Sequence, residues 1–265
     1  MKTHLIKVWV FQGLATLMIA LFSLTSVADN KISLVAGQNY YPYYAEDLEN
    51  GGVITQIITE AFRREKYQIN VRFIPWARAV HEVKTGKRDG IYGIWYRKER
   101  EEWIVYSDPL FLSKTMFLKR KENPISFKKL EDFGPHTIGI VRGYSYPKSF
   151  QEATYLRTIP AADNLSNMKL LTYKRIDLIL IEQGVGSYLM NTLPELKNEK
   201  LEWLEPPLEV LPHHIGFSKK DKNHQRNLEA FNKGLGEIKA DGTMRKIINA
   251  QEAKIPNFKL NIPAK

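Results

Sequence analysis

The sequence predicts an α/β protein of two lobes with a ligand cleft between them. Short apolar runs alternate with segments of helical spacing, and a charged run at 119–122 separates two such α/β blocks. A helical stretch then follows the second block, so the chain would cross between the lobes twice. That topology permits hinge closure over a ligand. We therefore expect lobe 1 to comprise residues 29–119 and 214–265, and lobe 2 to comprise residues 120–213.

Hydrophobic periodicity places the elements of the first lobe. Apolar residues recur at helical spacing after Gly51-Gly52, and they alternate as in a strand before Pro75-Trp76. An aromatic loop, Tyr40–Tyr44, follows the first apolar run. We expect strands at 32–36, 69–73 and 91–95, and helices at 53–62 and 77–85.

The junction after the strand at 91–95 is a predicted binding edge. The strand runs into a charged helix start, Lys98–Glu102, and ligands of open α/β sheets bind outside the carboxyl ends of strands. Arg100 stands at this junction with a guanidinium fork that suits a carboxylate. It could instead pair with Glu101 or Glu102 on a helix surface, but its place at a strand end favours ligand binding.

The second block has the same alternation. Asp163 has the side chain and position of a helix N-cap, and the run I-D-L-I-L-I at 176–181 predicts a buried strand that ends at Glu182. The segment 201–211 is extended and interrupted by prolines. We expect further strands at 136–141 and 213–217, and helices from 163 to 173, from 185 to 191, and from 225 to 250 with a break at Asp241-Gly242.

The first 28 residues have the pattern of a cleaved signal peptide. Lys2 and Lys7 precede an apolar run, Val8–Leu24, and the small residues Ser26-Val27-Ala28 suit a cleavage site. A membrane anchor is the alternative, because the apolar run approaches the length of a spanning helix. The small residues that follow the apolar run, and the lack of a second apolar span, favour cleavage and export.

Composition excludes several kinds of site. The chain of 265 residues has no cysteine, which rules out disulfides and zinc-thiolate centres. Its 39 Lys and Arg against 29 Asp and Glu give a net charge of +10, but the basic residues are scattered among acidic ones. This pattern favours a solvated surface over nucleic-acid binding. No metalloprotease, nucleophile-elbow, phosphate-loop or dinucleotide motif is present.

A set of ordered motifs resembles the periplasmic solute-binding proteins of the polar amino-acid type, solute-binding family 3. Each motif is weak alone, and their order over nearly the whole mature chain carries the resemblance. The motifs are Tyr40-Tyr41-Pro42-Tyr43, Gly51-Gly52, G-K-x-D-G at 86–90, E-R-x-x-x-I-x-Y-S-x-P at 99–109, the strand ending in Gly143-Tyr144-Ser145, D-L-x-L-x-E at 177–182, F-S-K-K at 217–220, F-N-x-G-L at 231–235, and D-G-T at 241–243.

The resemblance implies a two-lobed periplasmic binding protein fold of type II-like topology and assigns site residues by position. Arg100 would hold a ligand α-carboxylate and Glu182 an α-ammonium, while Tyr41 and Tyr43 would contact the ligand side chain. Glu182 could instead cap the helix that follows it. Relatives often have small hydroxyl residues where this chain has Trp95, Tyr96 and Arg97, and Gly-Thr where it has Gly143-Tyr144, so we expect an altered ligand.

Some aromatic and basic residues have more than one interpretation. Trp76 and Trp95 are favoured as core residues, although in the cleft they could stack on a planar or cationic ligand group. Tyr144 is a candidate contact because of its place in the second-lobe loop. Arg142 in the same loop is favoured as a surface residue, although its place at a strand end makes it a candidate second anion contact. Neighbouring strand residues point to opposite faces, so His213 and His214 are not expected to share a metal ion.

Taken together, these features predict a periplasmic binding protein that captures an amino acid or a related carboxylate by lobe closure. Its expected partner is a membrane permease of the ABC-transporter type, and we expect a monomer with no cofactor, no metal, no nucleic acid and no enzymatic activity. Two alternatives remain open. One is a cyclohexadienyl-type dehydratase on the same fold, with Glu182 as its acid, and the other is a ligand sensor that docks on a receptor.

Overall fold

The computed structural model describes residues 30–144, 146–196, 200–255 and 258–263, so the predicted signal peptide at 1–28 lies outside the described residues. The chain divides into a unit Met1–Lys31 and a unit Ile32–Lys265, and the fold below is that of the second unit. No helix among the residues described has the length and apolar character needed to span a bilayer.

One mixed sheet of nine strands runs through the unit Ile32–Lys265. Its strand order is β2-β1-β3-β9-β5-β8-β6-β7, and β4 also pairs with β9. The strands are β1 (Lys31–Gly37), β2 (Gln68–Ile74), β3 (Gly90–Trp95), β4 (Ile104–Tyr106), β5 (Phe111–Arg120), β6 (Thr137–Val141), β7 (Arg157–Ala161), β8 (Leu178–Glu182) and β9 (Leu201–Ser218). The helices are α2 (Val53–Arg64), α3 (Trp76–Lys84), α4 (Lys148–Gln151), α5 (Asn164–Thr172), α6 (Gln183–Thr192), α7 (His224–Ala240) and α8 (Thr243–Glu252).

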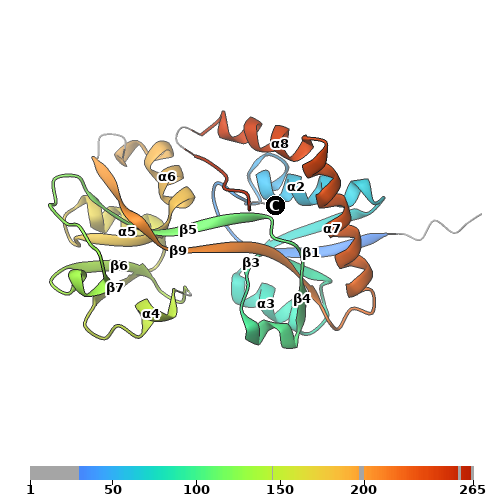
Figure 1. Ribbon diagram of the computed structural model, residues 1–265, viewed down its shortest axis with the longest axis horizontal. Helices are drawn as coiled ribbons and strands as arrows, with labels where there is room; N and C mark the ends of the chain where they lie inside the picture. The colour runs from blue at the N-terminus through green and yellow to red at the C-terminus, as the bar shows by residue number, and fades with distance from the viewer. Residues whose placement is uncertain (1–29, 145, 197–199, 256–257, 264–265) are drawn as a thin grey trace, which may run out of the picture. The chain divides into compact units, whose positions relative to one another are not determined.

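The elements form two groups that share the long strands β5 and β9. The first element group comprises β1–β4 with α2, α3, α7 and α8, and the second element group comprises β6–β8 with α4–α6. Figure 1 shows β5 and β9 running side by side from one group to the other, and they pair antiparallel from Phe111↔His213 to Arg120↔Leu201. The predicted lobe boundaries, 119/120 and 213/214, fall inside these two strands, and they stay a prediction.

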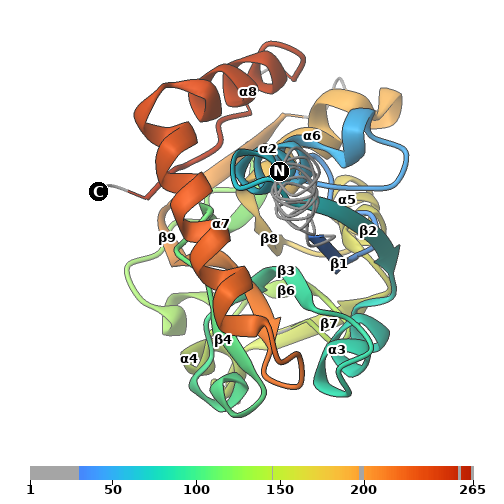
Figure 2. The same ribbon diagram turned by 90° about the vertical axis from the view of Figure 1, so that its right-hand side faces the viewer.

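The core of the first element group follows the predicted helical spacing. All the apolar positions of α2 that recur at this spacing are buried, from Val53 to Phe62. Figure 2 shows α7 passing over α2, and Phe231 and Leu235 of α7 are buried in the same cluster. The predicted break at Asp241-Gly242 is present between α7 and α8, where Gly242 has a left-handed backbone.

Two parts of the sheet differ from expectation. The strand β5 was not predicted at all, although its apolar residues other than Leu112 are buried. The segment predicted as an extended stretch followed by a short strand is one strand, β9, and its pairing with β5 shifts register between Thr115 and Phe117. The skipped residues of β9 include Pro206 and Pro207, which cannot donate to a strand ladder, so the prolines occupy an irregularity of the strand instead of ending it.

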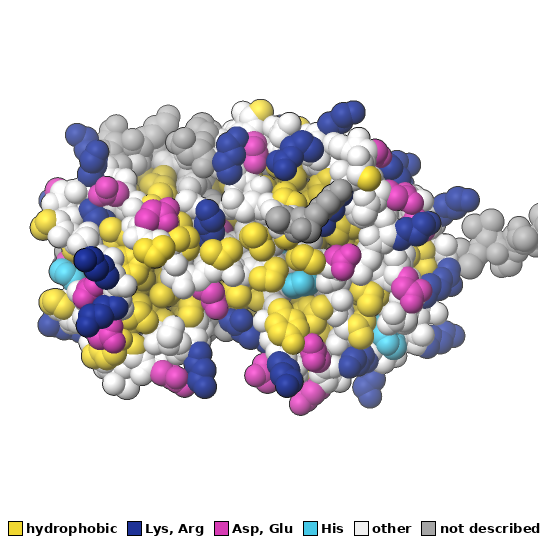
Figure 3. Space-filling model, in the orientation of Figure 1, with side chains coloured by type: hydrophobic (Ala, Val, Ile, Leu, Met, Phe, Trp, Pro, Cys, Tyr) yellow, Lys and Arg dark blue, Asp and Glu magenta, His cyan; other side chains and the backbone are white. Residues whose placement is uncertain are grey.

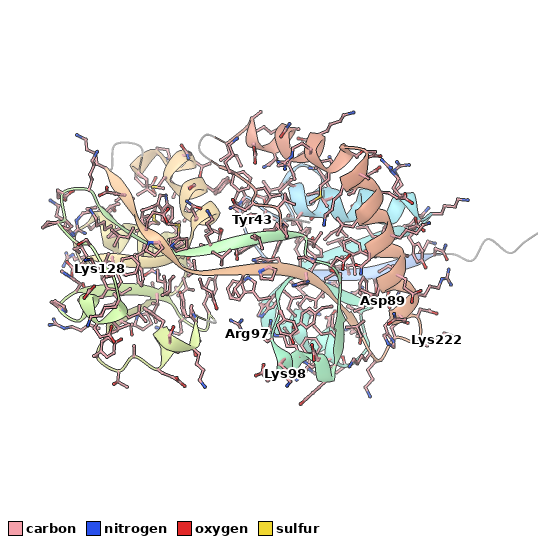
Figure 4. The ribbon with its side chains drawn as sticks, in the orientation of Figure 1. Tyr43, Asp89, Arg97, Lys98, Lys128 and Lys222 are labelled. Atoms are coloured by element: carbon pink, nitrogen blue, oxygen red, sulfur yellow. The ribbon has the colours of Figure 1, made fainter. Side chains whose placement is uncertain are left out.

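Charged side chains are mixed over the surface. On the face drawn in Figure 3, lysine and arginine side chains alternate with acidic ones, without one continuous basic patch. Figure 4 labels Lys222 and Lys128 at opposite ends of this view, and both are exposed. The distribution agrees with the solvated surface that the sequence predicts.

Candidate functional site

The carboxyl end of β3 forms one wall of a cavity that we call the large cavity. The strand shifts register against β9 between Tyr92 and Ile94, and Gly93 has a φ of 72° at that point. A Cβ atom on Gly93 would lie 2.2 Å from the Tyr44 hydroxyl, so only glycine allows the Tyr44 ring to approach the strand here. Gly93, Tyr44 and Trp95 all line the cavity.

Arg100 lies just beyond this strand, in a short 3-10 helix at Lys98–Glu102. One guanidinium nitrogen, Nη1, donates to the carbonyl oxygen of Trp95 at 2.8 Å. Burial lowers the pKa of the guanidinium, and Tyr106 partly offsets that effect. Among the residues described, no carboxylate lies within ion-pair distance of Arg100, so most of its N–H donors remain available to a ligand.

The second wall comes from the turn after β6. Gly143 has a φ of 79°, and the Tyr144 N–H donates to the Val141 carbonyl at 3.2 Å, which closes the turn. Arg142 and Tyr144 are exposed on this turn and line the same cavity as Arg100. The cavity has a volume of about 560 Å³. Its lining consists of Gly37, Gln38, Tyr40, Tyr44, Pro75, Trp76, Ala77, Gly93, Trp95, Arg100, Arg142, Gly143, Tyr144 and His213.

A smaller cavity of about 40 Å³ adjoins the large one. Tyr40, Trp95 and Tyr144 line both cavities, and Glu182 lines the small one. The Tyr40 hydroxyl oxygen is buried and has no hydrogen-bond partner among the residues described. The two neighbouring cavities therefore carry opposite charges, with two arginines in the large one and a carboxylate in the small one.

Glu182 is held from two sides at the carboxyl end of β8. The Tyr43 hydroxyl donates to its Oε1 at 2.8 Å, and the backbone N–H of Val185 donates to its Oε2 at 2.8 Å. Figure 4 shows Tyr43 above the strand β5, and Thr115 of that strand pairs with Glu182 of β8. Burial raises the pKa of the carboxyl, and hydrogen bonds from Val185 and Tyr43 oppose that shift. Glu182 is thus both the N-cap of α6 and part of the cavity wall.

His213 fixes the position of Trp95. The Trp95 Nε1–H donates to His213 Nε2 at 2.6 Å, and the Ser113 hydroxyl lies 2.9 Å from the same nitrogen. An indole N–H can only donate, so His213 Nε2 accepts and the ring is neutral. Burial lowers the pKa of His213 to about 3, with the neighbouring His214 acting in the same direction and the Gly93 backbone against it.

The structure brings five of the seven predicted site residues to these two cavities. Arg100, Trp76, Trp95 and Tyr144 line the large cavity, Tyr144 and Trp95 also line the small one, and Glu182 lines the small one. The favoured core interpretation of Trp76 is wrong, because 36% of its surface is exposed.

The two predicted tyrosines of the aromatic loop line neither cavity. Tyr41 stacks on Tyr188 with ring centroids 5.3 Å apart, and its hydroxyl donates to Asp47. Tyr43 is buried, and its hydroxyl donates to Glu182. The aromatic-loop residue that reaches both cavities is instead Tyr40, because a turn that ends at Tyr44 folds the loop back on itself.

Sequence reasoning also missed other lining residues. Tyr44 belongs to the same aromatic loop, and His213 was considered only as a metal ligand. Arg142, by contrast, was a candidate second anion contact because it follows a predicted strand, and it lines the same cavity as Arg100. Among the described residues, no group of three or more His, Cys, Asp or Glu side chains could hold a metal ion.

Comparisons with known proteins agree with this architecture. A protein of Campylobacter jejuni named as a probable histidine-binding protein is 28% identical over 237 residues, which cover 85% of this chain and 87% of that protein. A mutant of ArgBP from T. maritima superimposes with a TM-score of 0.69 at 19% identity, covering 84% of this chain and 96% of that one. A histidine kinase sensor domain with similarity to periplasmic binding proteins gives 0.72 at 18% identity, covering 88% and 98%.

The two structural likenesses establish the fold, which is that of the two-lobed periplasmic binding proteins. The family model described as bacterial extracellular solute-binding proteins, family 3, matches residues 32–250. That match covers most of the chain and includes every residue of both cavities. The protein therefore belongs to the bacterial extracellular solute-binding proteins, family 3.

Proposed function

We propose that this solute-binding protein captures a small carboxylate-bearing solute, an amino acid or a derivative, by closure of its two lobes. The observation that carries the proposal is the placement of opposite charges in the two neighbouring cavities. Arg100, which has no carboxylate partner among the described residues, lines the large cavity, and Glu182 lines the small one. A zwitterion needs a guanidinium fork for its carboxylate and a carboxylate for its ammonium group. As a member of a binding family, the protein holds its solute and does not convert it.

The roles of the remaining residues follow from their positions. Trp76, Trp95 and Tyr144 would enclose the rest of the ligand, and Tyr43 would orient the Glu182 carboxylate through its hydroxyl. Tyr41 would contribute only if closure moved it, because it stacks on Tyr188 in this conformation.

We place the protein in the periplasm, exported by the signal peptide at residues 1–28 and acting as a monomer that delivers its ligand to an ABC-type permease. The names of similar proteins support amino-acid binding in this context. A sensory role is the second candidate, and the likeness to a histidine kinase sensor domain favours it. Capture of a permease by the tagged, ligand-loaded protein would support transport, and capture of a sensor kinase would support the second candidate.

The first experiment is a thermal-shift screen of the mature protein against the common amino acids and small organic acids. A ligand present at 100 times its Kd stabilises a folded protein by about 2.7 kcal/mol, which gives a clear upward shift in Tm. Arg100→Ala should abolish the shift, and Arg100→Lys should weaken it, because lysine keeps the charge without the fork.

Arg63→Ala is the matched control. Arg63 is exposed, pairs with Glu60 on α2 and lies outside both cavities, so its replacement should leave the ligand shift unchanged. The amino-acid assignment fails if no amino acid shifts the Tm of the unmodified protein. The role of Arg100 fails if Arg100→Ala keeps the full shift.

A further inference from the structure

The large cavity has a charge imbalance that one α-carboxylate does not neutralise. Two arginines, Arg100 and Arg142, line it, and no aspartate or glutamate does. Within the described part of the chain, neither guanidinium forms an ion pair with a carboxylate, and Arg142 has no side-chain hydrogen bond. Two positive charges therefore face the same space without protein partners.

Nearby arginines outside the cavity behave differently. Arg78 and Arg88 both contact the buried carboxylate of Glu82, with Nε–oxygen distances of 3.0 and 3.1 Å. These two arginines therefore have a structural role, in which a carboxylate of the protein balances their charge. In the large cavity, by contrast, Arg142 has no carboxylate partner among the described residues, so a carboxylate of the ligand would be the first to match it.

The two arginines come from different parts of the fold. Arg100 follows β3 of the first element group, and Arg142 follows β6 of the second. Arg100 is half-buried and Arg142 is exposed, so solvent screens Arg142 more strongly. A ligand that spans the cavity can place one anionic group on each arginine.

The walls and the small cavity define the rest of the ligand. Five aromatic side chains line the same cavity as the two arginines, namely Tyr40, Tyr44, Trp76, Trp95 and Tyr144. The one carboxylate of the two neighbouring cavities, Glu182, already accepts hydrogen bonds from Tyr43 and Val185 and lies in a space of about 40 Å³. That space suits an α-ammonium group and is too small for a second cationic side chain. A basic side chain would instead lie among the arginines of the large cavity.

We infer that the preferred solute is an acidic amino acid, with its α-carboxylate on Arg100 and its side-chain carboxylate on Arg142. The inference rests on the proposed function and narrows its substrate class. It excludes basic amino acids as preferred ligands, because their side-chain cations would face the two unpaired guanidinium groups.

Isothermal titration of the mature protein with matched probes tests this inference. L-Glutamate and L-glutamine differ in charge but hardly in shape, and so do L-aspartate and L-asparagine, while L-arginine is the basic probe. At least one acidic probe should bind about tenfold or more tightly than its amide, with L-arginine the weakest of the five. The acidic probe should also lose affinity as salt rises, since Arg142 is exposed.

Arg142→Gln should reduce the preference for the acid over the amide to near one, and it should leave the affinity for the amide almost unchanged. That difference separates a ligand contact from a general loss of structure, which would weaken both probes equally. Arg157→Gln is the control, because Arg157 is exposed on the neighbouring strand β7 and lines neither cavity.

The outcomes distinguish this inference from the proposed function. If amides or L-arginine bind as tightly as the acids, or if Arg142→Gln weakens acid and amide equally, the inference is wrong while amino-acid binding stands. If none of the amino acids binds the unmodified protein, the amino-acid function itself fails and the inference fails with it.

Discussion

Single side chains in this protein serve the fold and the cavity at once. Glu182 caps α6 through the Val185 N–H, which confirms its interpretation as a helix cap, and it also lines the small cavity. Its hydrogen bond from Tyr43 links the aromatic loop to β8. Whether Glu182 touches the ligand is the part that remains a prediction.

His213 gives a pH-dependent prediction at the same scale. Its pKa in the folded protein is about 3, against 6.5 in the absence of burial, so between these values the unfolded chain binds the extra proton. The free energy of unfolding should therefore fall as pH drops from 6.5 towards 3, by up to about 1.4 kcal/mol per pH unit from this group. The stabilising effect is fully present above pH 6.5.

Urea unfolding between pH 7 and pH 4 measures this effect. His213→Gln, which removes the titrating ring, should show a shallower loss of stability with acid than the unmodified protein. NMR of the ring nitrogens gives an independent check that does not depend on the variant folding, because Nε2 of His213 should remain unprotonated at pH 5. A His213 ring that is charged at that pH contradicts the prediction.

At the scale of elements, the shape of the cavity depends on the irregularity in β3. Gly93 has a left-handed backbone, and its missing side chain leaves room for the buried ring of Tyr44. Any residue other than glycine at position 93 would place a Cβ atom against that hydroxyl group. The deviation of the strand therefore lies where the ligand is proposed to bind, as is common for bulges.

We expect Gly93→Ala to destabilise the protein by about 2 kcal/mol or more, because it combines left-handed strain with a contact to Tyr44 that cannot form without movement. Ligand affinity should fall as well. Gly236→Ala is the matched control, since Gly236 lies within α7 with open space around its Cβ position. That control should stabilise the protein by about 0.5–1 kcal/mol, and chemical denaturation of both variants measures the difference. Equal effects of the two substitutions would contradict the assignment.

Local patterns in the sequence predicted the elements that carry a clear period. The helical spacing of α2 and the break between α7 and α8 are confirmed, and the N-cap at Asp163 accepts a hydrogen bond from the Ser166 N–H at 2.7 Å. The strands β5 and β9 were missed or shortened because their identity depends on pairing with each other over a long sequence separation. Prolines normally argue against a strand, and only the register shift in the β5–β9 pair accommodates Pro206 and Pro207.

At the site, too, residues next to strand ends could be found from the sequence, whereas residues whose direction depends on a folded turn could not. Arg100 follows β3 and Glu182 ends β8; the carboxyl-end rule indicated the first and the family resemblance the second, and both line cavities. Tyr41 and Tyr43 line neither cavity whereas Tyr40 lines both, and the ligand contacts of Tyr41 and Tyr43 stay a prediction. A turn decides which tyrosine faces inward, and strand-like alternation does not apply there.

At the scale of the whole unit Ile32–Lys265, the two element groups share the sheet only through β5 and β9 within the described residues. The ligand-facing turns, 97–103 and 142–144, belong to different groups. If a ligand joins Arg100 to Arg142, both turns should become ordered together, and bending should concentrate at the register shift near Thr115. Pairs such as Phe111↔His213 should remain formed throughout.

Hydrogen exchange with and without the amino acid that gives the largest thermal shift measures this coupling. Backbone amides in 97–103 and in 142–144 should both exchange more slowly in the loaded protein, because closure removes both turns from solvent. Amides at the β5–β9 pairs near Phe111 should exchange slowly in both states and serve as the internal control. Protection confined to 97–103 would mean that the ligand binds one element group alone, and closure over the ligand would then be wrong. Protection of both turns that disappears in Arg142→Gln would identify the second arginine as the contact that couples the lobes.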